Sequence, residues 1–60
     1  MKRELRGLRM GAGLTQQQLA DILGVTHISV SRWETGKSIP SPKYIKALAD
    51  LFGTRKRYFF

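Results

Sequence analysis

The sequence has no cysteine and only four acidic residues among its 60. It therefore lacks disulfide bridges and thiolate metal ligands, two supports on which chains of this length often depend. A single histidine and four carboxylates are too few to predict a metal site, so neither a metal nor another cofactor is expected. The fold must rest on packing, and the absence of cysteine fits a reducing cytoplasm.

Long apolar runs are also missing. None approaches the roughly 20 residues that span a bilayer, and no apolar segment follows the charged residues 1–4, so neither a membrane helix nor a signal peptide is predicted. No glycine-rich phosphate loop, carboxylate pair or nucleophile–histidine arrangement is present, which argues against an enzyme with a small-molecule substrate. Eleven Lys and Arg against the four acids leave a formal charge of +7. This excess favours a polyanionic partner, nucleic acid before an anionic membrane surface.

The first half of the chain predicts two helices separated by a glycine-rich turn. The first covers residues 2–10 and ends at the glycines of residues 11–13. The second begins after Thr15, because Thr15 and Gln18 have the Thr-x-x-Gln spacing of a capping box. It ends at Gly24, since glycine readily takes the left-handed conformation that closes a helix.

A third helix follows almost at once, because only Val25 separates Gly24 from Thr26, the next candidate N-cap. It is expected over residues 26–35 and is closed by Gly36. Two helices joined by so short a turn must cross sharply, which is the geometry of a helix-turn-helix unit, here about residues 16–35.

The last part of the chain predicts a fourth helix and a shorter fifth one. The fourth has Ser41 as its cap and Pro42 at its first position, where proline is favoured. Its apolar face comprises Ile45, Leu48, Ala49 and Phe52. The fifth covers residues 54–60, and its aromatic residues Tyr58, Phe59 and Phe60 are expected to close over the core. The predicted fold is an all-α bundle of four to five short helices in one domain, residues 1–60.

The third helix has two different faces. At about 100° per residue, Val30 and the only tryptophan, Trp33, share one side, which we interpret as the core side. The opposite side carries Ile28, Ser31, Arg32 and Thr35, with His27 at its flank. An arginine can bridge the two acceptors of guanine, small hydroxyls can bond phosphates or base edges, and an isoleucine can contact a thymine methyl group. The alternative is a solvated face with one exposed isoleucine, which is common in proteins.

Four segments in this region form a recognisable pattern. They read L-T-Q-Q-Q-L-A at residues 14–20, L-G-V-T at 23–26, V-S-R-W-E-T-G-K at 30–37, and a proline at residue 40. With this pattern the chain resembles the phage-repressor/Cro-type (Xre) helix-turn-helix family. Weaker similarity reaches residues 51–53, while Thr54 and the basic residues 55–57 depart from the family pattern. The resemblance implies a bundle of about five helices whose second and third helices bind DNA.

The resemblance also implies roles for single residues. Base-reading positions are matched by His27, Ile28 and Arg32, with Ser31 beside them. Phosphate-contacting positions are matched by Gln16, Thr26, Thr35 and Lys37, and the resemblance implies that Gln16 also braces the third helix. Arg9 and Glu34 match the positions of a partly buried ion pair that ties the first helix to the third. Glu34 is therefore expected to be structural, although it lies on the recognition helix.

The sequence thus predicts a sequence-specific regulator of transcription, expected to be a repressor, that binds double-stranded DNA in a prokaryotic cytoplasm or phage system. A homodimer on a dyad-symmetric operator is expected, with Tyr44, Leu51 or the terminal aromatic residues as a possible contact. Sixty residues make either a minimal regulator or the DNA-binding part of a longer one. An antitoxin or adaptor of the same fold, with a protein as its main partner, is the alternative. Binding to anionic membranes is a third interpretation, but two capping signatures specify a bundle rather than one long amphipathic helix.

Overall fold

The computed structural model describes residues 2–59, and Phe60 of the predicted aromatic cover lies outside them. Its elements are α1 (Lys2–Gly11), α2 (Gln16–Leu23), α3 (His27–Thr35), α4 (Pro42–Phe52) and the short 3-10 helix η1 (Lys56–Phe59). No strand occurs within residues 2–59, so the prediction of an all-α bundle is confirmed. None of the helices in this part of the chain is long and apolar enough to cross a bilayer.

The start of α2 has the predicted capping box. The backbone N–H of Gln18 donates to Thr15 Oγ1 at 3.0 Å, and the Gln18 side chain accepts from the Thr15 N–H at 2.8 Å. Two of the N–H groups that would otherwise lack partners at the helix start are thereby satisfied. The helix ends at Gly24, whose φ of 73° is the left-handed conformation that glycine adopts without strain.

The helix α3 begins and ends by the same local rules. Its N-cap is Thr26, whose Oγ1 accepts a hydrogen bond from the Ser29 N–H at 3.4 Å. Its C-cap is Gly36, with a φ of 80°. Because only residues 24–26 connect α2 to α3, the two helices pack directly against each other.

The start of α4 differs from the prediction in one respect. Ser41 occupies the N-cap position and Pro42 the first position, but the Ser41 side chain makes no capping hydrogen bond. The backbone alone closes this turn, as the Ser41 carbonyl accepts from Tyr44 and Ile45 at 2.9 and 3.0 Å. The fixed φ of Pro42, which has no N–H to satisfy, stabilises the start in place of a side-chain cap.

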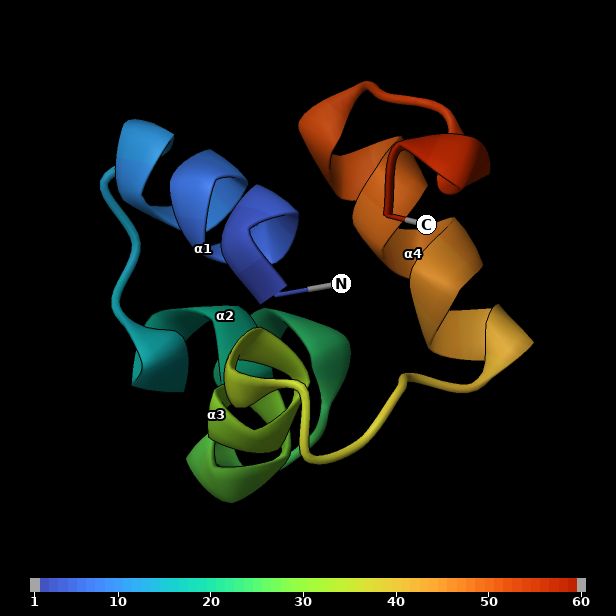
Figure 1. The fold of residues 1–60 in the computed structure, drawn as a ribbon. Helices are drawn as coiled ribbons and strands as arrows, with labels where there is room; N and C mark the ends of the chain where they lie inside the picture. Colours follow the sequence, from blue (N-terminus) through green and yellow to red (C-terminus); the bar gives the residue numbers. More distant parts are fainter. Residues whose placement is uncertain (1, 60) are drawn as a thin grey trace.

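The core lies between α1, the α2–α3 pair and α4 (Figure 1). It consists of Leu5, Leu19, Ala20, Val30, Trp33, Ile45, Leu48, Ala49 and Phe59. Phe59 is 1% exposed and covers one end of this core. The same role predicted for Tyr58 is wrong, because Tyr58 is 48% exposed, although its ring makes an edge-to-face contact with that of Phe59. Neighbouring residues of a tight 3-10 helix point in different directions, so η1 can bury one ring and not both.

Figure 1 also shows how the elements divide the bundle. The α2–α3 pair forms its lower side, while α1 and the C-terminal segment lie on the upper side.

Candidate nucleic-acid interface

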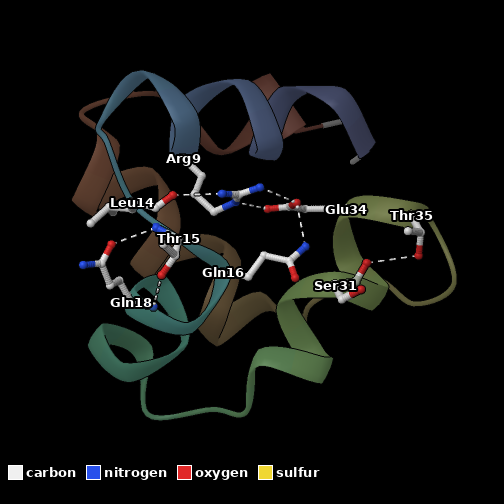
Figure 2. A network of polar contacts seen from close by, with 8 residues as sticks. All are labelled: Arg9, Leu14, Thr15, Gln16, Gln18, Ser31, Glu34 and Thr35. Carbon is white, nitrogen blue, oxygen red and sulfur yellow. Dashed lines mark hydrogen bonds and ion pairs between the residues drawn. The ribbon is translucent and has the colours of Figure 1, made fainter.

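A network of polar contacts fixes the inner side of α3 (Figure 2). Arg9 on α1 donates to both carboxylate oxygens of Glu34 on α3, from Nε to Oε2 at 2.6 Å and from Nη2 to Oε1 at 3.1 Å. Its Nη1 donates to the Leu14 carbonyl at 2.8 Å. Gln16, the first residue of α2, donates from Nε2 to Glu34 Oε1 at 3.1 Å. The Glu34 carboxylate on α3 thus binds side chains from both α1 and α2. Through the Leu14 carbonyl, Arg9 also binds the loop between α1 and α2.

The pair is nearly removed from water, since the side chains of Arg9 and Glu34 are 11% and 4% exposed. The hydrogen bonds from Arg9 to Glu34 raise the pKa of the Arg9 guanidinium, although burial acts in the opposite direction. Two parallel N–H···O bonds between a planar guanidinium and a carboxylate hold both groups in one orientation. No buried side-chain nitrogen or oxygen lacks a partner within residues 3–59. The network therefore restrains the orientation of α3 within the bundle, and with it the direction in which the outer side of α3 faces.

Sequence reasoning missed two parts of this network. The Leu14 carbonyl is a backbone acceptor with no side-chain signature, and the resemblance gave Gln16 only a phosphate and a general bracing role. Gln16 and Glu34 are 18 positions apart. The only available signal was the place of Gln16 at the first position of α2, directly after the cap, from which a side chain can reach the neighbouring helix.

The outer side of α3 holds the predicted base-reading residues together. His27, Ile28 and Arg32 are exposed, and Ile28 is 57% exposed despite being apolar. Ser31, one turn after His27 and Ile28, is half-buried. Trp33 is 6% exposed, because its ring packs in the core with its centroid 5.7 Å from that of Tyr44. The structure thus separates a buried aromatic side of α3 from an outer side of mixed polar and apolar chemistry.

The predicted phosphate-contacting residues lie at the start of α2 and at the two ends of α3. The two threonines among them differ in whether their hydroxyl hydrogen is available to a phosphate. Thr26 Oγ1 accepts from the Ser29 N–H and lies 3.5 Å from Ser29 Oγ, where either hydroxyl can be the donor. When Ser29 is the donor, the hydrogen of Thr26 is left to donate outward. Thr35 Oγ1 instead donates to the Ser31 carbonyl at 3.0 Å, an alternative being the Arg32 carbonyl at 3.3 Å. Its hydrogen is thereby used inside the helix (Figure 2), and a phosphate could be bonded only after the side chain rotates.

The remaining two predicted phosphate contacts are Lys37, which supplies a positive charge, and Gln16, which supplies a side-chain amide. Lys37, just after α3, is exposed and forms no ion pair with the described residues. Gln16 uses one amide hydrogen for Glu34 and keeps the second, so it can hold Glu34 and still donate to a phosphate. Within the described residues no three His, Asp or Glu side chains form a group that could hold a metal ion.

Comparison with known proteins gives matches over most of the chain. A family model described as helix-turn-helix matches residues 5–59. The chain is 41% identical over 49 residues to the HTH-type transcriptional activator BcrR of Enterococcus faecalis, covering 82% of this chain and 24% of that protein. It is 35% identical over 49 residues to the SPbeta prophage-derived uncharacterized HTH-type transcriptional regulator YonR of Bacillus subtilis, covering 82% and 45%.

A third relative is the HTH-type transcriptional regulator DicA of Escherichia coli, 46% identical over 37 residues, with 62% of this chain and 27% of DicA covered. The chain thus corresponds to between about a quarter and less than half of these relatives' lengths. No solved structure matches it significantly.

Proposed function

Because the chain belongs to the helix-turn-helix family of the phage-repressor and Cro type, we propose that it is a sequence-specific, double-stranded DNA-binding regulator of transcription. One observation carries this proposal. The inner side of α3 is held by the Arg9–Glu34–Gln16 contacts, while its outer side presents His27, Ile28 and Arg32 to solvent. A rigid helix with such an outer face suits insertion into the major groove, where base edges differ in their donors, acceptors and methyl groups.

In this proposal each outer residue of α3 has a chemical task. The Arg32 guanidinium donates to the two acceptors of a guanine, and Ile28 contacts a thymine methyl group. His27 lies at the first position of α3, where its ring can reach a base edge. Ser31 lies beside these residues and can contact only a base edge or phosphate that comes close to the helix, because its side chain is short and half-buried.

The phosphate contacts lie around this reading face. Gln16 and Thr26 donate to phosphate oxygens from the starts of α2 and α3, where the helix dipole also favours negative charge. Lys37 adds a charge at the other end of α3. Thr35 contributes only if its hydroxyl leaves the Ser31 carbonyl.

We further propose that residues 1–60 act as one DNA-binding domain and that two copies bind a dyad-symmetric operator at the nucleoid in the cytoplasm. Leu51 and Tyr58 are 41% and 48% exposed and Tyr44 is half-buried, and we assign these residues to a dimer contact. Repression is the proposed mode, because a protein on DNA excludes others without any further contact. No catalytic activity is part of this function.

Selection from a pool of randomised duplexes at near-physiological salt tests the proposal. We expect a short motif with dyad symmetry and half-sites about one helical turn apart. The salt concentration matters, because each neutralised phosphate contributes about −0.9 to the slope of log K against log salt, and low salt would let non-specific binding dominate. If a folded sample enriches no motif, sequence-specific binding is refuted and an adaptor or antitoxin of this fold becomes the better account.

A further inference from the structure

Most of the positive charge lies away from α3. Of the six arginines only Arg32 belongs to the outer side of α3. Five exposed cationic residues sit on α1 and in the C-terminal segment: Arg3, Arg6, Arg55, Lys56 and Arg57. We call these five residues together the α1–η1 basic face, in which Arg55, Lys56 and Arg57 are consecutive and spread around the start of η1 and do not share one direction. The helix η1 packs against both α1 and α4, so the two parts of this face belong to neighbouring elements.

The charges of the basic face are not neutralised within the described part of the chain. Two carboxylates are engaged elsewhere, Glu34 with Arg9 and Asp50 with Lys46. Asp21 accepts from Gln17 on α2. Glu4 is half-buried on α1, and at about 100° per residue it points about 100° to 160° away from Arg3 and Arg6. None of the five basic residues forms an ion pair within residues 3–59.

The basic face and the reading face are on different sides of the bundle. In Figure 1 α1 and the C-terminal segment lie opposite α2 and α3. The side chains of Leu5 and Phe59 fill the core between them, so Arg3, Arg6 and the residues around Phe59 face outward. The bundle measures 23 × 23 × 19 Å. We expect a straight duplex seated on α3 to leave the basic face uncovered, because α1 and the C-terminal segment lie on the other side of the bundle in Figure 1.

The composition of the face favours phosphate as its ligand. Four of its five members are arginines, whose planar guanidinium donates two parallel hydrogen bonds to a phosphate. Among the described residues, the exposed apolar side chains beside these cations are Met10 on α1 and Tyr58 on η1, which lie on different elements and do not form one continuous apolar side for insertion into a membrane.

We propose that the α1–η1 basic face binds the phosphate backbone of a second DNA duplex, without regard to sequence, while α3 occupies the first. This inference rests on the proposed function for the first duplex and adds to it the bridging of two DNA segments. The contact consists of charge and hydrogen bonds to phosphates, and it carries no base reading.

Co-capture of two duplexes tests the proposal. The full chain is bound to an immobilised duplex carrying the motif recovered by selection, or a mixed-sequence duplex if none is recovered. A fluorescent duplex of unrelated sequence is then added at about 0.15 M salt. Two variants remove two charges each from the face, Arg3→Gln with Arg6→Gln and Arg55→Gln with Arg57→Gln. A control, Lys43→Gln with Lys46→Gln, removes the same charge from α4.

We expect the wild type and the control to retain the fluorescent duplex and both face variants to lose it, while binding to the immobilised duplex stays the same. If each arginine neutralises one phosphate, the loss of two should weaken the second contact about 30-fold at this salt concentration. If the face variants still retain the fluorescent duplex, the two duplexes are bridged through the α3 helices of two protein copies, and the proposal is overturned.

Three other results would also overturn it. Equal weakening of the first duplex would place the basic residues on the same DNA as α3. Displacement of the fluorescent duplex by poly-glutamate as readily as by unlabelled duplex would mean that the face does not prefer phosphate. Binding of the first duplex without any capture of the second leaves the proposed function intact and refutes only this inference, whereas binding of neither refutes both.

Discussion

Replacing Glu34 by alanine should unfold the domain before it changes any preference for DNA sequence. Glu34 accepts three hydrogen bonds, two from Arg9 and one from Gln16. After Glu34→Ala the buried Arg9 guanidinium keeps only the Leu14 carbonyl as a partner. A charge left in this position, 11% exposed in the intact protein, is strongly destabilising because it is neither hydrated nor paired.

The expected loss is a large part of the total stability. Removing one partner of a buried ion pair typically costs about 3–5 kcal/mol. A chain of this length is stabilised by about 3–9 kcal/mol in all, at roughly 0.05–0.15 kcal/mol per residue. The loss is therefore between about a third and all of the stability, so the variant is expected to unfold at a much lower urea concentration than the wild type or to be unfolded in buffer. Removing both charges, by Arg9→Met together with Glu34→Met, should restore part of the stability because no charge is then stranded.

Urea unfolding followed by tryptophan fluorescence measures this effect, because Trp33 is the only tryptophan and is 6% exposed. The matched control is Asp50→Ala, which removes a carboxylate from the exposed Lys46–Asp50 pair and should cost less than about 1 kcal/mol. A wild-type midpoint for Glu34→Ala, or a double variant less stable than the single one, would refute the role of the network.

Three further predictions concern single side chains. Thr15→Ala should lower the unfolding free energy by about 1 kcal/mol through the loss of the capping bond to Gln18, and an unchanged urea midpoint would contradict this. Phe59→Ala should cost about 3–5 kcal/mol and Tyr58→Ala about 1 kcal/mol, and similar losses for both would show that Phe59 is not the core cover. Gln16→Ala should weaken binding by the same factor on every duplex in a titration series, whereas a changed order of preference would assign it to base reading.

The helices could be predicted from sequence because their boundaries are local. Thr15 and Gln18 are three positions apart, and a glycine at position 24 or 36 needs no distant partner to end a helix. The alternation of Val30 and Trp33 with polar residues likewise defines the inner side of α3 within one helix. In these segments local propensity and the final packing agree.

The remaining features depend on contacts that spacing does not reveal. The Arg9–Glu34 pair joins residues 25 positions apart and was implied only by the family resemblance. The contact between Gln16 and Glu34 was missed for the same reason. In η1 the sequence places Tyr58 and Phe59 side by side without indicating which ring enters the core, and the packing against α1 and α4 decides it.

The central claim is that the outer side of α3 reads base sequence, and a comparison of wild type with Arg32→Ala tests it most directly. Affinities for a duplex with the selected motif and for its single-base variants are measured at one salt concentration. The account predicts that Arg32→Ala loses about 1–3 kcal/mol of discrimination at one guanine per half-site and keeps its preferences elsewhere. A loss of equal size on every duplex would contradict it, because Arg32 would then contact only phosphate.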